Sequence, residues 1–151
     1  MAMKKKGKKL VNPRFAKGGG YGEIINSIAS IGHCPFCPEN FKYHKKPALK
    51  KMGGWFITES RWPYKNSQKH FLIISTKHHE TLGELKAADM RTILSLATWA
   101  VKRYKIKGGG LTMRFGDSDF TGATVSHLHA HLIYPQETKA GIGKTVNFPI
   151  G

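Results

Sequence analysis

The sequence predicts a single α+β domain in which an antiparallel sheet packs against one long helix. Short apolar runs typical of strands follow one another along the chain, and one longer stretch has helical periodicity. No internal repeat is present. With 151 residues, 40% of them hydrophobic, the chain is long enough for one ordinary domain with a buried core and too short for two.

The first twenty residues differ in composition from the rest. They contain seven lysines and arginines and no acidic residue, and they end in three glycines at positions 18–20. They also lack apolar periodicity, so we expect a flexible basic arm over residues 1–20 and a single domain over 21–151. The formal net charge of the whole chain is +16, which is suited to phosphate-bearing partners.

The first half of the predicted domain contains two strands. A short helix is expected before them at residues 23–30, and the two prolines at 35 and 38 indicate a turn. A basic connector follows over residues 42–51. The apolar runs at 55–58 and 70–75 then predict strands, the second of them buried.

The second half supplies the helix and two more strands. Apolar residues recur at helical spacing over 85–104, basic residues cluster at the end of this stretch, and the glycines at 108–110 terminate it. Further strands are expected at 111–115 and 125–134, separated by a polar loop.

Three histidines alternate within the last predicted strand. Because residues two apart in a strand share a face, His127, His129 and His131 are expected on one side, opposite Leu128 and Ala130. Imidazole can act as a neutral nucleophile, a proton donor or a metal ligand near physiological pH. We therefore expect this face to carry the chemistry of the protein.

The loop before this strand has the composition of a phosphate-binding loop. Gly122 lets the backbone approach a ligand closely, while Thr124 and Ser126 supply hydroxyl donors. Such residues also populate ordinary turns.

Cys34 and Cys37 form a Cys-x2-Cys pair, which is half of a tetrahedral zinc site. The missing ligands should be histidines, and His33, His44 and His79 are close enough in sequence to compete for that role. A reduced thiol pair without metal is the alternative. The spacing favours metal binding or redox chemistry in a reducing compartment over a structural disulfide, so we expect a cytoplasmic location.

The His-x-His-x-His run followed by apolar residues resembles the signature of the histidine triad superfamily. The resemblance covers most of residues 33–135 and includes Pro63-Tyr64, the apolar run that begins at His70, and Lys77-His78. The segment 34–40 is similar to the zinc turn of the galactose-1-phosphate uridylyltransferase branch. The chain length and the third histidine are closer to the small hydrolase-like branches.

The resemblance implies a nucleotide hydrolase or nucleotidyltransferase, commonly dimeric, that acts at an α-phosphate. His129 would attack phosphorus and form a nucleotidyl-histidine, His131 would hydrogen-bond the phosphoryl oxygens, and Thr124 would contact the phosphate or leaving group. It also implies a structural zinc ion held by four residues, namely Cys34, Cys37, His78 and His127. His70, which opens an apolar strand, is expected to be a structural hydrogen-bonder rather than a metal ligand.

The substrate-binding positions depart from the usual pattern of the family. Ser60 stands where an acidic or amide residue usually holds the ribose, and Arg114 stands where small phosphoramidase-like members carry asparagine. Phe36 is expected either to line a base pocket or to pack in the core, and the same two alternatives apply to Trp62 and Tyr64.

The alternative hypothesis is a zinc-stabilised basic module that binds nucleic acid without catalysis. Its partner would be held by lysines, including those of the arm. The sequence lacks the interleaving of aromatic and basic residues typical of single-strand binders, so the enzyme hypothesis is preferred. No apolar run approaches the roughly 20 residues of a membrane helix, so no membrane partner is expected.

Overall fold

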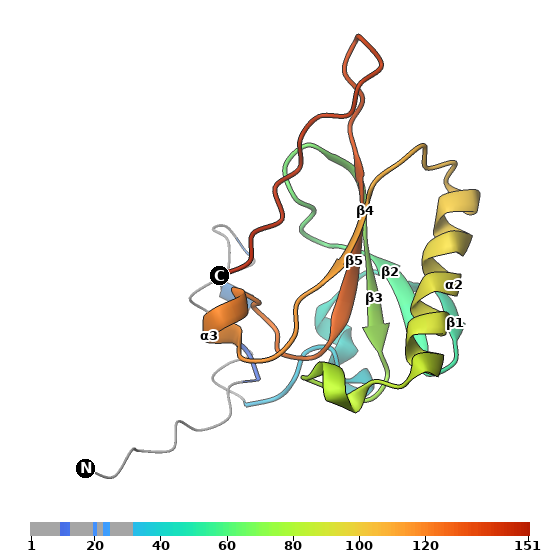
Figure 1. Cartoon of the computed structure of the whole chain (residues 1–151). Helices are drawn as coiled ribbons and strands as arrows, with labels where there is room; N and C mark the ends of the chain where they lie inside the picture. Colours follow the sequence, from blue (N-terminus) through green and yellow to red (C-terminus); the bar gives the residue numbers. More distant parts are fainter. Residues whose placement is uncertain (1–9, 13–19, 21–22, 25–31) are drawn as a thin grey trace.

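The computed structural model describes residues 10–12, 20, 23–24 and 32–151. Five antiparallel strands form one sheet in the order β1-β2-β3-β5-β4, and helix α2 lies along one face of it (Figure 1). The strands are β1 (Ala48–Met52), β2 (Trp55–Glu59), β3 (Ser67–Ser75), β4 (Gly110–Met113) and β5 (His129–Pro135). The helices are α2 (Ala87–Arg103), α3 (Ser118–Thr121) and two 3-10 turns, η2 (Pro38–Tyr43) and η3 (Leu82–Glu84). The predicted α+β fold is confirmed.

The main core lies between α2 and the sheet. The buried face of α2 is formed by Ile93, Leu96, Ala97 and Ala100. Alternate residues of β3 face it, so Phe71 and Ile73 join this cluster while Leu72 and Ile74 pack on the opposite face. Burying each of these large side chains stabilises the fold by about 1.5–3 kcal/mol.

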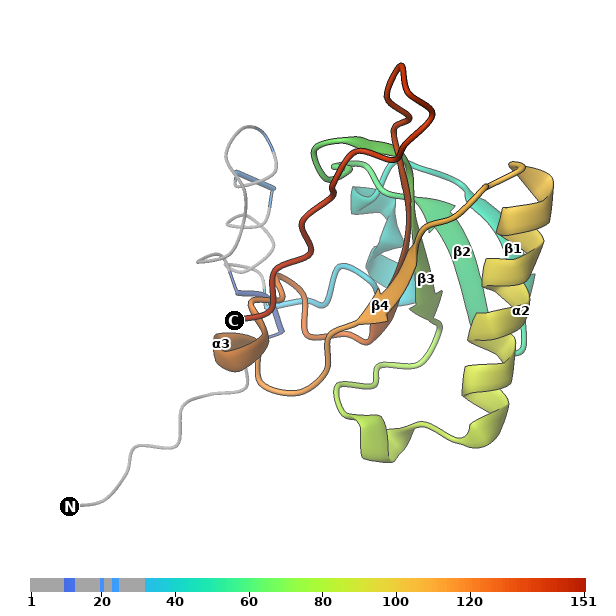
Figure 2. The same ribbon diagram turned by 45° about the horizontal axis from the view of Figure 1, so that its top comes forward.

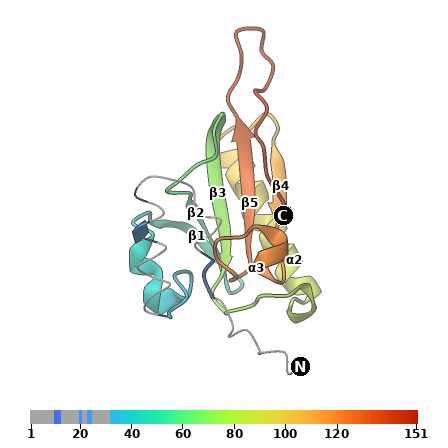
Figure 3. The same cartoon turned by 90° about the vertical axis from the view of Figure 1, so that its left-hand side faces the viewer.

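The two faces of the sheet have different roles. Ala130 and Leu132 of β5 pack in the α2 core, and so the intervening His129 and His131 point to the other face. Figure 3 shows α3 in front of the sheet and α2 behind it, and Figure 1 shows the same two helices on opposite sides. The site therefore forms on the face without the long helix.

Two expectations about strands are wrong. Residues 48–52 form β1 rather than part of a connector, because their lysines sit on an edge strand whose side chains can reach water. The last strand begins at His129 rather than at residue 125. Before it, backbone N–H groups hydrogen-bond to residues outside the sheet: Leu128 N–H donates to His79 O, and Ser126 N–H donates to Leu10 O.

The predicted arm and the predicted helix at 23–30 fall largely outside the described residues. Residues 10–12 are an exception, because they pack on the domain: Val11 forms a β-bridge with Val125, and Asn12 N–H donates to Thr124 O at 2.7 Å. After β5 the chain makes a hairpin and returns toward α3, where the last described residue lies (Figure 2). None of the described helices has the length and apolar character needed to cross a membrane.

Candidate functional site

Two cysteines and two histidines meet at one end of the sheet. The ligand atoms of Cys34, Cys37, His78 and His127 all lie within 4.8 Å of one another. His127 Nδ1 is 3.3 Å from Cys34 Sγ, and His78 Nδ1 is 3.5 Å from Cys37 Sγ. The cysteines come from the turn before η2, and the histidines come from the loops after β3 and before β5. The structure thus brings together the four residues that the family resemblance assigned to zinc.

Hydrogen bonds fix which nitrogen each of these imidazoles offers. His127 Nε2 is 2.7 Å from Ser75 O, and because a carbonyl can only accept, Nε2 carries the hydrogen. His78 Nε2 lies 2.8 Å from Glu80 Oε1 in the same way. In the neutral rings, both Nδ1 lone pairs therefore face the thiols, as metal-ligating histidines with an outer acceptor do.

The electrostatics of this cluster suit a cation. Burial lowers the pKa of His127 to about 4, although its bond to Ser75 O partly opposes this, so the ring is neutral. Burial also raises the pKa of Cys34, and burial next to Cys34 raises that of Cys37 to about 12. Without a cation the thiols would stay protonated. Two sulfurs and two imidazole nitrogens are a donor set that Zn²⁺ prefers, so the residues fit this metal.

The competing histidines lie elsewhere. His33 is exposed, and His44 is buried with its Nε2 2.9 Å from Glu59 O. His79 turns toward Glu84, with Nδ1 3.9 Å from a carboxylate oxygen. None of the three belongs to the four-residue cluster.

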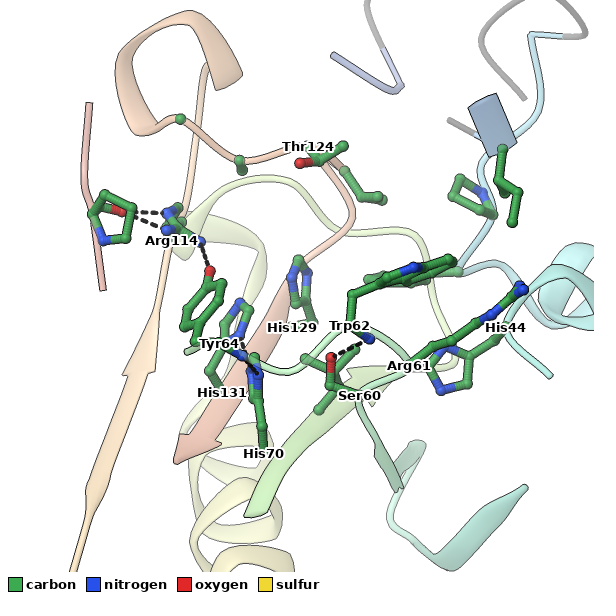
Figure 4. A pocket seen from close by; sticks show the side chains of 18 of the residues that line it. His44, Ser60, Arg61, Trp62, Tyr64, His70, Arg114, Thr124, His129 and His131 are labelled. Atoms are coloured by element: carbon green, nitrogen blue, oxygen red, sulfur yellow. Dashed lines mark hydrogen bonds between the residues drawn. The ribbon is translucent and has the colours of Figure 1, made fainter. Parts of the chain in front are cut away.

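A cavity of about 190 Å³ lies beside the cluster, on the face of the sheet away from α2. Figure 4 shows His129 near its middle, with Arg114 and Tyr64 on one side and Trp62, Arg61 and His44 on the other. Seven of the eight residues expected at the substrate line this cavity: Phe36, Ser60, Arg114, Gly122, Thr124, His129 and His131. Ser126 is buried but does not line it.

His129 presents a bare nitrogen to the cavity. Its Nδ1 lies 2.7 Å from the backbone oxygen of His127, so Nδ1 carries the hydrogen and Nε2 of the neutral ring keeps its lone pair. Burial lowers the pKa of His129 to about 4, and the nearby Arg114 lowers it further while the His127 carbonyl opposes the shift. Phe36 contacts the ring edge-on, with centroids 4.9 Å apart. A neutral, oriented imidazole with an available lone pair is a nucleophile.

A chain of hydrogen bonds gives His131 the opposite character. Tyr64 N–H donates to His70 Nδ1 at 3.3 Å, so the neutral His70 ring carries its hydrogen on Nε2. That nitrogen lies 2.9 Å from His131 Nδ1, which must accept. Neutral His131 therefore carries its hydrogen on Nε2 and can donate it. The expectation that His70 is a structural hydrogen-bonder is confirmed.

The segment after the hairpin forms part of the cavity wall, which the sequence reasoning missed. Pro149 and Gly151 line the cavity, and the Phe148 ring lies 4.9 Å from that of His131. The only sequence signal was an aromatic residue next to a proline in a polar stretch. Gly122 is required for a reason other than ligand approach: its φ is +70°, and a Cβ there would lie 2.6 Å from Gly151 O.

Comparisons with known proteins identify a family and a shared fold. Residues 65–138 match the HIT domain family. A histidine triad nucleotide-binding protein from Candida albicans superposes with a TM-score of 0.60 at 20% identity, covering 79% of this chain and 85% of that one.

Two further solved structures are similar. A hypothetical histidine triad nucleotide-binding protein from Sulfolobus tokodaii has a TM-score of 0.55 at 24% identity, covering 70% of this chain and 71% of that one. A HIT family hydrolase from Clostridium thermocellum has a TM-score of 0.53 at 22% identity, covering 68% and 90%. No curated protein matches the sequence. At these identities the solved structures establish a shared fold.

Proposed function

This chain belongs to the histidine triad family, and on that premise we propose that it is a nucleotide hydrolase or nucleotidyltransferase that works through a nucleotidyl-histidine on His129. The observation that carries the proposal is the hydrogen bond from His129 Nδ1 to the His127 carbonyl, which leaves Nε2 bare in the cavity. A nucleophile held in this way needs no general base to remove a proton before it attacks.

In the first step, His129 Nε2 forms a bond to the α-phosphorus and the bond from phosphorus to the leaving group breaks. The leaving group takes that electron pair. His131 Nε2–H and the Thr124 hydroxyl supply hydrogen bonds to the phosphoryl oxygens, in a cavity whose permanently charged side chains, among the residues that the structure describes, are Arg61 and Arg114. Preorganised donors of this kind stabilise the negative charge of the transition state.

In the second step, water or another acceptor attacks the same phosphorus and the P–N bond breaks. His129 recovers its lone pair, the acceptor loses a proton, and a nucleoside monophosphate or its transfer product is released. Imidazole is a good leaving group as well as a good nucleophile, so two easier displacements replace one difficult one.

We propose that Cys34, Cys37, His78 and His127 hold a structural Zn²⁺. Four protein ligands leave no open coordination position, so the metal supplies a cross-link between the turn at 34–37 and two loops of the sheet. Thiol ligands must stay reduced, which supports a cytoplasmic location.

We also propose that the protein is a homodimer. Strand β4 lies at one edge of the sheet, and next to it a shallow groove is lined by apolar residues of α2 and β4. Leu94 and Leu111 in this groove are 61% and 45% exposed. A second copy would cover them, and sedimentation of wild type and Leu111→Lys tests this: a monomer in both cases contradicts the dimer.

The test of the enzymatic proposal is to trap the adduct. The protein is incubated with a nucleoside phosphoramidate, a dinucleoside polyphosphate and a nucleotide sugar, quenched in denaturant, and its intact mass is measured. We expect a gain of one nucleotidyl group, located on the peptide that contains residue 129. The adduct and turnover should be lost in His129→Ala and kept in His33→Ala, which removes an exposed histidine outside the cavity.

Normal turnover by His129→Ala would refute the mechanism. If wild type turns over none of these substrates but binds oligonucleotides with a steep dependence on salt, the non-catalytic nucleic-acid module is the better account. Removing residues 1–9, which carry five lysines, would then weaken that binding.

A further inference from the structure

Each end of the cavity carries an arginine and an aromatic side chain. On one side of His129 lies Trp62, with the Arg61 guanidinium 4.5 Å from the centre of its ring (Figure 4). On the other side, Arg114 stands beside Tyr64 and Pro149 (Figure 4). We place the nucleoside at the Trp62 end, where a base can stack, because the Tyr64 ring at the other end already packs against His131 and Phe148. The rest of the substrate then extends toward the mouth of the cavity or toward Arg114.

The partners that hold Arg114 in the described part of the chain are uncharged. Its Nε donates to Pro149 O at 2.9 Å, and an Nη donates to the same oxygen. The other Nη donates to Tyr64 Oη at 3.3 Å, and the guanidinium carbon lies 3.9 Å from the centre of the Phe148 ring. These contacts orient the guanidinium and do not neutralise it. Within the described part of the chain, no carboxylate forms an ion pair with Arg114.

The charged side chains among the described residues of the cavity wall have the same sign. Of the described residues that line it, none is aspartate or glutamate, and the permanently charged ones are Arg61 and Arg114. A half-buried, oriented and uncompensated guanidinium facing a cavity is suited to a bound anion, since a phosphate oxygen pair matches its fork.

We propose that Arg114 binds an anionic leaving group, so that the enzyme prefers phosphoanhydride substrates, which release a phosphate or polyphosphate, over phosphoramidates, which release a neutral amine. The inference rests on the proposed function, because it assigns the leaving group of that same reaction. When a phosphoanhydride reacts, the P–O bond to the bridging oxygen breaks and its electron pair stays on the departing phosphate.

The departing phosphate therefore gains negative charge in the transition state, and Arg114 would stabilise this charge more than that of the ground state. When a phosphoramidate reacts, the P–N bond breaks and the nitrogen takes a proton, so it departs uncharged. A guanidinium gives that departure no comparable advantage. The identity of the leaving group thus determines how much Arg114 contributes.

The experiment compares two substrates with the same nucleotidyl group, ATP and adenosine 5′-phosphoramidate, on full-length wild type and Arg114→Gln. Glutamine keeps an N–H for the Pro149 carbonyl and removes the charge. We expect kcat/KM for ATP to fall on the order of 100-fold. For the phosphoramidate it should fall no more than about 3-fold, and Arg114→Lys should recover part of the ATP activity because it restores the charge.

Arg61→Gln is the matched control, since it removes the guanidinium at the other end of the same cavity. It should lower kcat/KM for both substrates by similar factors. If Arg114→Gln also lowers both equally, Arg114 only holds the segment around Pro149 and the proposal is overturned. No effect on ATP would overturn it as well.

Binding of inorganic pyrophosphate, measured by calorimetry, separates this inference from the proposed function. We expect wild type to bind it at least 10-fold more tightly than Arg114→Gln, whatever the turnover. If wild type cleaves neither nucleotide but shows this difference, the proposed function fails and the anion site stands. If wild type cleaves nucleotides but pyrophosphate binds both proteins equally, the anion site is refuted.

Discussion

His127 and His129 are two residues apart in the sequence, yet they belong to two different sites. The ring of His127 gives Nε2–H to Ser75 O and turns Nδ1 to the cysteines. The ring of His129 gives Nδ1–H to His127 O and leaves Nε2 to the cavity. The same side chain thus offers Nδ1 to two cysteines in one region and Nε2 to a cavity in the other.

A backbone carbonyl decides the role in each case, because it accepts from one ring nitrogen and so fixes the lone pair on the other. The two regions are also joined, since the carbonyl that orients His129 belongs to His127 itself. If the two histidines have these separate roles, substitutions in the cavity should remove activity and leave the free energy of unfolding nearly unchanged. Substitutions in the four-residue cluster should mainly lower the free energy of unfolding.

The largest expected effect is that of His129→Ala on catalysis. Loss of the nucleophile should lower kcat on the order of 10³-fold or more. The free energy of unfolding should change by only about 1 kcal/mol, because His129 already borders an open cavity. Initial rates and urea melts of the same sample measure both. A large loss of stability would mean that His129 is a structural residue.

Removal of the metal should have the next largest effect, and on stability. Because the proposed zinc ion would bind only the folded arrangement of the four residues, prolonged chelation or Cys34→Ser should lower the free energy of unfolding by about 3 kcal/mol or more. Metal content by mass spectrometry and thermal melts with and without chelator measure this. If a chelator removes zinc from the protein and the melting temperature does not change, the stabilising role of the cluster is contradicted.

Glu80 provides a smaller and more local test of the cluster. Its carboxylate accepts from His78 Nε2 at 2.8 Å, and Glu80→Gln replaces it with a weaker, neutral acceptor. We expect zinc affinity to fall about 10- to 100-fold in competition with a chromophoric chelator. Glu137→Gln is the control, since Glu137 pairs with Lys107 on the surface. Equal affinities for all three proteins would show that Glu80 does not support the ligand.

The elements with strong apolar patterns could be predicted from the sequence. The periodicity of residues 85–104 gave α2, and the continuous apolar run of β3 gave a strand buried on both faces. Strand β1 was not predicted, because its edge position tolerates Lys50 and Lys51, and these lysines indicated a connector rather than a strand. The start of β5 was missed because the partners of the preceding backbone, Leu10 and His79, are remote in sequence.

The site depended on contacts of the same remote kind. The histidine spacing identified the reactive run, but the register that pairs Leu72 with His131 is what brings His70 within 2.9 Å of that ring. The choice of His78 over His79 likewise follows from how the chain leaves β3. No local pattern shows that Pro149 returns to Arg114, because 35 residues and a hairpin separate them.

The loop between α3 and β5 connects the two regions, and Asn12 holds it. Thr124 lines the cavity and His127 belongs to the cluster, while Asn12 N–H donates to Thr124 O between them. The side chain of Asn12 is 2% exposed, and its Nδ2 donates to Ser118 Oγ at 3.1 Å and to Asp119 Oδ1 at 2.9 Å. Asn12 therefore fixes α3 relative to the middle of this loop.

Asn12→Ala should have the smallest of these effects and should touch both regions. We expect a loss of about 1–2 kcal/mol in the free energy of unfolding, since a buried donor to a carboxylate is removed. Asn12→Asp should lose more than Asn12→Ala, because it removes the same donor and adds a negative charge beside Asp119.

The Ser126 amide donates to Leu10 O, and its hydrogen exchange should accelerate in both variants. Because Thr124 loses the support of Asn12, KM should rise by a larger factor than kcat falls. If Thr124→Ala and Asn12→Ala have strictly additive effects on KM, Asn12 does not act through Thr124, and the loop is held by other contacts. If instead the double variant is no worse than Thr124→Ala alone, the residues at 10–12 are the support of the substrate loop. The cavity and the four-residue cluster would then differ in chemistry but depend on the same segment, residues 10–12.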